Sequence, residues 1–99
     1  MMDKKKKLWR ELEEGFGGGS KFRILLHLVL HPNDSHTRYA LVKATGLRTP
    51  SVEEHLRILV KIGWVKEYPF EPKTYQINMD HEIVKSFVEF LEKISHSER

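Results

Sequence analysis

The sequence predicts a small, mainly helical fold that carries one β-hairpin, and three observations support this prediction. Apolar residues recur at helical spacing through most of the chain, and glycine and proline signals divide it into short segments. The alternation typical of strands is found in residues 64–68 and 74–78. The chain has 99 residues, of which 39% are hydrophobic and none is cysteine, so we expect one domain with a modest core and no disulfide.

Two helices are expected in the first third of the chain. Leu8, Leu12 and Phe16 lie at positions i, i+4 and i+8, which predicts an amphipathic helix that ends at the glycine cluster. Ser20 is expected to cap a second helix at residues 21–30, whose side chains are apolar on nearly every side. This second helix is therefore predicted to be the central, buried one.

Two helices joined by a tight turn are expected in the middle of the chain. The first is predicted to start near Thr37 or Tyr39 and to end at Gly46. Thr49 and Pro50 then form a helix start signal, with a cap followed by a proline at the first helical position. The inward stripe of this fourth helix is expected to consist of Val52, Leu56, Leu59 and Gly63.

A hairpin and a last helix complete the predicted order. Residues 64–68 and 74–78 are expected to be its two strands, with a proline-stiffened loop between them. Asp80 is expected to cap a final helix from His81 to about Ile94. This order is the layout of a winged helix-turn-helix with additional N- and C-terminal helices.

Positive charge is concentrated in the middle of the chain, although the formal net charge is only +3. Residues 20–63 hold seven basic and three acidic residues, whereas residues 80–99 hold three basic and five acidic ones. This asymmetry indicates a polyanion as the partner of the middle segment. No apolar run is long enough to span a bilayer and no signal peptide is recognisable, so we expect a cytoplasmic protein with no membrane partner.

One residue pattern runs through the predicted motif into the hairpin. It consists of Leu41, Ala44, Gly46, Leu47, Val52, His55, Leu56, Leu59, Gly63 and Val65. Together with the hairpin end at residues 73–78, this pattern resembles the winged helix-turn-helix of the ArsR-like regulators, and it is close to the archaeal type. The resemblance covers residues 20–91 and implies a homodimeric transcription regulator whose second motif helix enters the DNA major groove. It also implies repression by occlusion of a promoter.

The helix at residues 50–62 is accordingly expected to read double-stranded DNA, and its neighbourhood supplies the candidate contacts. The expected base-facing residues are Arg48, Thr49, Ser51 and Glu54. The expected phosphate-binding residues are Arg38, Lys43, Arg57, Lys61 and Lys73, and Lys21 and Lys66 extend this basic set.

Two acidic residues on this helix, Glu53 and Glu54, are unusual for a DNA reader. Glutamate can accept a hydrogen bond from cytosine N4, but phosphates repel it. A local explanation is also available, because acids stabilise the first turn of a helix and Glu53 can pair with Arg57 at i, i+4. The acids leave an alternative open, in which the winged helix is a protein-protein interaction module in a larger complex.

Both terminal helices are more apolar than one small core requires, so we expect them to pack against a second copy of the chain. In this interpretation residues 1–19 and 80–99 are dimerisation segments that frame a DNA-binding domain at residues 20–79. The expected dimer interface consists of Leu8, Trp9, Leu12, Phe16, Phe87, Phe90, Leu91 and Ile94. A two-fold dimer places its two recognition helices about one DNA turn apart, ~34 Å.

The sequence supports neither a metal site nor an enzyme. His27 and His31 lie at i, i+4, but two histidines do not make a metal site, and the acids and histidines of the last helix lack the spacing of paired ligands. No phosphate-binding glycine loop and no nucleophile elbow are present. We therefore expect no cofactor and no catalytic activity, and an effector ligand is left open.

Overall fold

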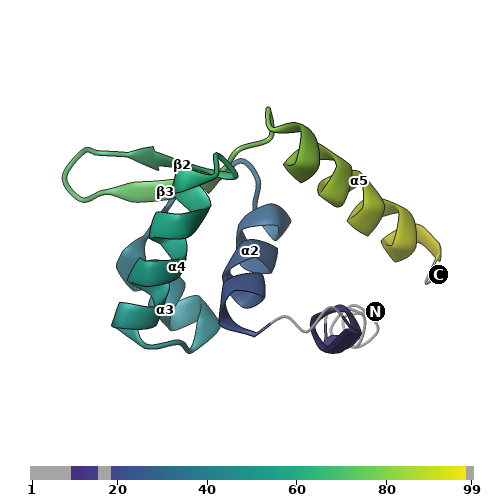
Figure 1. The fold of residues 1–99 in the computed structure, drawn as a ribbon, viewed down its shortest axis with the longest axis horizontal. Helices are drawn as coiled ribbons and strands as arrows, with labels where there is room; N and C mark the ends of the chain where they lie inside the picture. The colour runs from purple at the N-terminus through teal and green to yellow at the C-terminus, as the bar shows by residue number, and fades with distance from the viewer. Residues whose placement is uncertain (1–9, 16–18, 98–99) are drawn as a thin grey trace.

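The computed structural model describes residues 10–15 and 19–97 (Figure 1). Residues 10–15 are helical. The elements that follow are α2 (Ser20–Leu30), β1 (His36–Thr37), α3 (Arg38–Thr45), α4 (Thr49–Lys61), β2 (Val65–Tyr68), β3 (Thr74–Ile77) and α5 (Glu82–Ser97). This order confirms the predicted fold class, a winged helix-turn-helix with additional helices at both ends.

The core lies between α2, α3 and α4, with α2 at its centre as predicted. Ile24 and Leu28 on α2, Leu41 on α3 and Val52 on α4 have no exposed surface. Full burial of one such side chain contributes about 1.5–3 kcal/mol. These contacts hold α4 in a fixed orientation against α2 and α3. The face of α4 opposite the core therefore points to solvent.

The third helix has the ends that the sequence predicts. The Thr37 hydroxyl accepts a hydrogen bond from the Ala40 backbone N–H at 3.0 Å, so Thr37 is the N-cap of α3. Gly46 ends the helix in the left-handed conformation, with φ 74°, and its N–H donates to the Val42 carbonyl. A glycine adopts this conformation without the steric penalty of a Cβ atom, which explains its place in the turn before α4.

The starts of α2 and α4 differ from the prediction by one residue each. The first backbone hydrogen bond of α2 runs from Arg23 to Gly19, so Gly19 is the N-cap and Ser20 already belongs to the helix. In α4 the Val52 N–H donates to the Arg48 carbonyl, and no side chain caps the helix. The predictions that Ser20 and Thr49 are caps were wrong because each helix extends one residue further toward the N-terminus.

The start of α5 also differs from the prediction. The Nδ1 atom of His81 accepts a hydrogen bond from the Ile83 N–H at 3.2 Å, whereas the Asp80 backbone N–H donates to the Asn78 side chain. The His81 side chain therefore satisfies a free N–H in the first turn of α5, the role that was predicted for Asp80. The helix itself extends beyond the predicted end, to Ser97.

The sheet has three antiparallel strands in the order β1-β3-β2. Val65 pairs with Ile77 and Tyr68 pairs with Thr74, so the hairpin lies where the sequence predicts it. Each strand is one residue shorter than predicted, because residue 64 lies before β2 and residue 78 lies after β3. The sequence did not predict β1, because two residues are too few to show alternation. Its His36 pairs with Tyr75 and joins the hairpin to the N-terminus of α3.

The two terminal segments add to the same core. Val84, Val88 and Leu91 of α5 are buried, and Leu12 packs against the core cluster. Figure 1 shows α5 on the opposite side of α2 from the hairpin. No helix among the described residues has the length and apolar character that crossing a membrane requires.

Candidate nucleic-acid interface

The fourth helix presents one face to the core and the other to solvent, as its periodicity predicts. Val52, Leu56 and Leu59 are at most 2% exposed. The charged residues of the opposite face, all exposed, are Glu53, Glu54, Arg57 and Lys61. Figure 1 shows α4 at the surface, with α3 beside it and the hairpin leaving from its C-terminal end. The outer face of α4 is thus uncovered by any other described element.

The four predicted base-facing residues lie along the first two turns of α4. Arg48 and Thr49 are exposed at its start, and Ser51 is half-buried. Glu54 is exposed and accepts a hydrogen bond from Nη2 of Arg57 at 2.8 Å. This hydrogen bond, with the positive charge of the guanidinium as the second cause, lowers the pKa of the Glu54 carboxyl.

Glu53 pairs with Arg38 and not with Arg57. Arg38 is the first residue of α3, and its guanidinium donates to the Glu53 carboxylate on α4. Arg57 pairs with Glu54 instead, at i, i+3. The predicted i, i+4 pair was wrong because α3 brings a second arginine to Glu53, which a pattern within one helix does not reveal.

The basic residues of the hairpin are paired as well. Nζ of Lys73 lies 3.4 Å from the Glu67 carboxylate, across the hairpin. Nζ of Lys66 lies 3.4 Å from the carboxylate of Asp80, near the start of α5. Four of the predicted phosphate-binding cations therefore already have a carboxylate partner in the free protein, when Arg38 and Arg57 are included.

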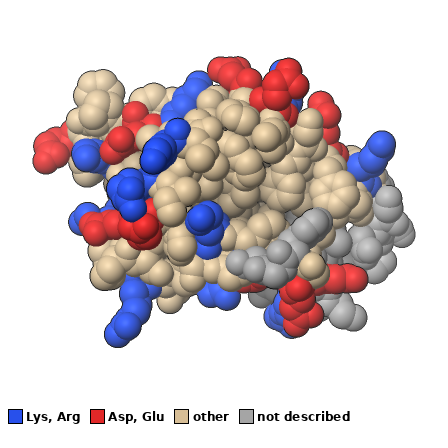
Figure 2. All heavy atoms as spheres, viewed as in Figure 1, with Lys and Arg blue, Asp and Glu red and all other residues tan. Residues whose placement is uncertain are grey.

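The other four predicted cations, Lys21 among them, form no salt bridge with a carboxylate among the described residues. Arg48 and Lys61 are exposed at the two ends of α4. Lys43 lies over the ring of Tyr39, with Nζ 5.5 Å from the ring centroid. Figure 2 shows basic side chains along the side of α3, α4 and the hairpin, with acidic side chains between them. The surface therefore carries both positive and negative charges. Its cations differ in whether an ion pair must be broken before they can bind an anion.

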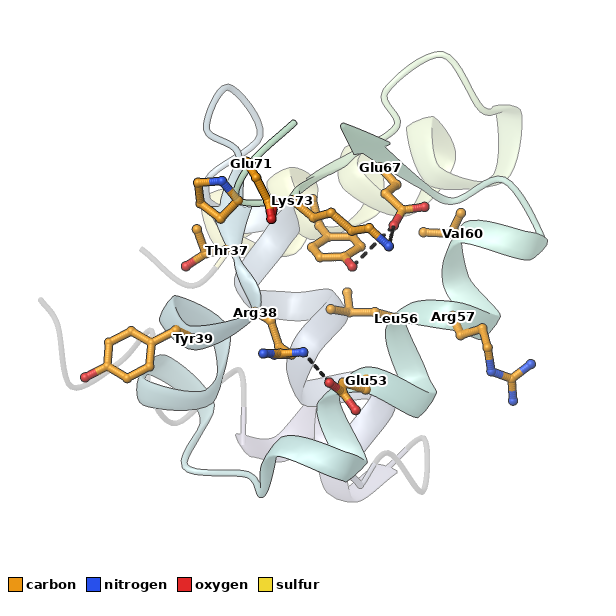
Figure 3. Close-up of a pocket in the computed structure, with 12 residues that line it drawn as sticks. Thr37, Arg38, Tyr39, Glu53, Leu56, Arg57, Val60, Glu67, Glu71 and Lys73 are labelled. Carbon is orange, nitrogen blue, oxygen red and sulfur yellow. Dashed lines mark hydrogen bonds and ion pairs between the residues drawn. The ribbon is translucent and has the colours of Figure 1, made fainter. Parts of the chain in front are cut away.

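A hollow of about 640 Å³ lies between α4, the start of α3 and the hairpin (Figure 3). The pairs Arg38–Glu53 and Lys73–Glu67 both line it, together with the apolar side chains Leu56, Val60 and Tyr75. The Tyr75 hydroxyl donates to Glu67 at 3.4 Å, and burial, followed by the charge of Glu67, raises the pKa of Tyr75. The sequence could not predict this hollow, because it forms only when the hairpin folds beside α4.

A cluster of three histidines lies at the other end of β1. His27 on α2 is 4.7 Å from His31 and 5.1 Å from His36, measured between ring centroids. Burial lowers the pKa of His27 and of His36, and the neighbouring imidazoles lower it further, while Asp34 opposes the shift of His36. Within the described ranges, no three acidic, histidine or cysteine residues have an arrangement suited to a metal ion. His55 is half-buried, and its Nδ1 is buried without a hydrogen-bond partner in the described part of the chain.

The residues predicted to form a dimer interface are divided between the core and the surface. Leu91 is 4% exposed, Leu12, Phe87 and Ile94 are half-buried, and Phe90 is 41% exposed. Leu8, Trp9 and Phe16 lie outside the described residues. A groove of about 490 Å³ runs between α2 and α5, and its lining consists of Phe22, Leu25, Trp64, Ile83, Ser86, Phe87 and Phe90.

Comparison with known proteins gives a result at the level of structure. No protein-family model matches the chain, and no curated protein matches it significantly in sequence. Among solved structures it is similar to MepR, a transcription regulator of the Staphylococcus aureus multidrug efflux pump MepA, with a TM-score of 0.62 and 20% identity. That match covers 97% of this chain and 73% of MepR. A mutant of S. aureus MepR aligns over the same shares of both chains, with 20% identity and a TM-score of 0.60. The likeness supports the winged helix-turn-helix fold derived above.

Proposed function

We propose that the chain is a homodimeric transcription regulator that binds double-stranded DNA through α4. The observation that carries this proposal is the uncovered outer face of α4, which holds Arg57 and Lys61 and begins at the exposed Arg48. A helix held in this way between a second helix and a hairpin has the form that enters a major groove. The structural likeness to MepR, itself a transcription regulator, agrees with the same function.

The contacts divide into two classes under this proposal. Base edges are read from the start of α4 by Arg48, Thr49, Ser51 and Glu54, while phosphates are held by Arg38, Lys43, Arg57, Lys61 and Lys73. The phosphate contacts supply most of the affinity through the release of counterions. The acids of α4 do not exclude DNA, because each of them holds an arginine in an exposed ion pair that costs little to break.

The second copy of the chain occupies the groove between α2 and α5. Ile83 and Phe90 are 55% and 41% exposed at this groove, and exposed apolar side chains of this size are typical of a protein interface. Residues 20–79 are then the DNA-binding domain, and residues 1–19 and 80–99 contribute to dimerisation. The resemblance to ArsR-like regulators, which commonly dimerise through flanking helices, supports the same assembly.

Selection of bound sequences from a pool of random duplex DNA tests the function. We expect enrichment of a two-fold symmetric site whose half-sites lie about one helical turn apart, ~34 Å. Affinity for that site should fall by orders of magnitude between about 50 and 200 mM salt. Absence of any enriched sequence would exclude a sequence-specific regulator and favour the protein-binding alternative.

A further inference from the structure

Arg38, Arg57 and Lys73 are the cations that line the hollow. Two of them, Arg38 and Lys73, also have their carboxylate partner in its lining. Arg38 comes from the start of α3, and Lys73 comes from the end of the hairpin loop, just before β3. Figure 3 shows Arg38 next to α4 and Lys73 on the side of the hairpin. Their side chains are 54% and 61% exposed, so an anion in solution can reach both of them.

Arg38 and Lys73 are each bound to a carboxylate that lines the same hollow, and a third carboxylate, Glu71, lines it as well. Glu53 accepts the hydrogen bond of Arg38, and Glu67 lies beside Lys73. Ion pairs this exposed contribute little to stability, because water screens them and ordering two long side chains costs entropy. An anion that contacts both cations can therefore displace both carboxylates at low cost.

The other two ion pairs of this region are placed differently. The guanidinium of Arg57 points away from the pairs in the hollow (Figure 3). Lys66 and its partner Asp80 do not line the hollow at all. Arg38 and Lys73 are thus a distinct pair of cations, and Asp80, a paired carboxylate outside the hollow, provides a control for the change of net charge.

We propose that the hollow is a phosphodiester-binding site, where Arg38 and Lys73 exchange Glu53 and Glu67 for phosphates of one DNA strand. This inference rests on the proposed function and specifies where the strand beside α4 runs. Phosphate is the favoured occupant because it repeats along a strand and so offers anions to both cations at once. The planar guanidinium of Arg38 can donate two parallel N–H hydrogen bonds to the oxygens of one phosphate.

The test measures the binding of a mixed-sequence duplex of about three helical turns between about 50 and 200 mM salt. In the plot of log affinity against log salt concentration, Arg38→Gln and Lys73→Gln should each reduce the slope by about 0.9, the value for one lost phosphate contact. The control Lys85→Gln, at an exposed position of α5 away from the proposed DNA contacts, should leave the slope unchanged. All three side chains are exposed, and unchanged circular dichroism would show that the variants remain folded.

Removal of the competing carboxylates tests the exchange itself. Glu53→Gln and Glu67→Gln should each tighten duplex binding about two- to fivefold, the range expected when an exposed ion pair no longer has to be broken. Asp80→Asn makes the same change of net charge outside the hollow, and it should increase the affinity for duplex less than the two glutamate variants do.

The outcomes separate the two proposals. If the wild-type chain binds duplex and the slopes of the Arg38 and Lys73 variants equal that of the wild type, the phosphate site is wrong and the regulator proposal stands. If Asp80→Asn tightens duplex binding as much as the two glutamate variants do, the gain in affinity comes from net charge alone. That result would overturn the proposed exchange of carboxylates for phosphates. If the wild-type chain binds no duplex even at low salt, both proposals fail.

Discussion

The hollow beside α4 and the groove beside α5 are two concave regions of the described surface, and they differ in the chemistry of the side chains that line them. The hollow is lined by both cations and carboxylates, and Arg38 holds Glu53 while Lys73 holds Glu67. The groove is lined almost wholly by apolar side chains, among them Ile83 and Phe90, which remain partly exposed to water. The cations of the hollow thus already hold carboxylate partners, whereas no described element covers the apolar side chains of the groove.

This difference sets what each partner must do. A partner of the hollow has to compete with an existing carboxylate, so its affinity depends on charge and on salt concentration. A partner of the groove only has to cover apolar surface, which releases water and is insensitive to moderate salt. Under the proposed function, the second copy is held by burial of apolar surface and the DNA is bound through charge-dependent contacts.

The largest expected effect concerns the side of α5 that faces the core. Leu91→Ala removes a side chain that is 4% exposed, so we expect a loss of about 2–5 kcal/mol in the free energy of unfolding, from lost burial and the cavity left behind. Urea unfolding at a fixed protein concentration measures this loss. A change below about 1 kcal/mol together with loss of the dimer would place Leu91 in the interface and extend the groove across α5.

The next effect concerns the exposed side of the same helix. The double substitution Ile83→Glu with Phe90→Glu places two carboxylates in the proposed interface, and we expect the dimer dissociation constant to rise at least about 30-fold, equivalent to ~2 kcal/mol. Analytical ultracentrifugation measures it. Lys85→Glu, which adds a carboxylate at an exposed position of α5, is the control and should leave the dimer intact. An unchanged dimer in the double variant would show that the groove is not the interface.

The hollow and the groove also differ in how far the sequence could predict them. The apolar faces follow from helical periodicity, so the central position of α2 and the inward stripe of α4 were both predicted. Phe90 was predicted to lie in an interface, but Ile83 was not, because periodicity does not reveal which apolar residues of α5 the rest of the chain leaves uncovered. Sequence therefore indicates that a face is apolar, and the fold decides what remains exposed.

The charged contacts depend on residues that are distant in sequence, and there the prediction was weaker. Glu53 was assigned to Arg57 within one helix, whereas the arginine that contacts it comes from the start of α3. His36 joins His27 and His31 because β1 pairs with β3, and two residues of strand leave no pattern in the sequence. In both cases the tertiary fold chooses the partner, and local spacing does not contain that information.

A smaller effect distinguishes free from paired cations. Lys61 has no carboxylate partner among the described residues, so it can bind phosphate without breaking an ion pair. We expect Lys61→Gln and Arg38→Gln to reduce the salt slope equally, by about 0.9, but Lys61→Gln should weaken duplex binding more at low salt. Titration of labelled duplex by fluorescence anisotropy measures both quantities. A slope unchanged by Lys61→Gln would remove Lys61 from the phosphate contacts.

The smallest effect tests whether acid weakens the fold through the histidine cluster behind the hairpin. Burial and the neighbouring imidazoles hold the pKa of His27 and His36 below the ordinary histidine value, about 6.5. The unfolded chain therefore binds more protons at these two residues than the folded one does. The stability that depends on neutral His27 and His36 is present above pH 6.5 and is lost as the pH falls through their lowered pKa values. We expect the free energy of unfolding to decrease between about pH 7 and 5, a window in which most carboxylates stay ionised.

The double variant His27→Gln with His36→Gln should show a flatter dependence of the free energy of unfolding on pH, measured by urea unfolding. A profile as steep as that of the wild type would assign the pH dependence to other groups and leave the cluster without a role in stability.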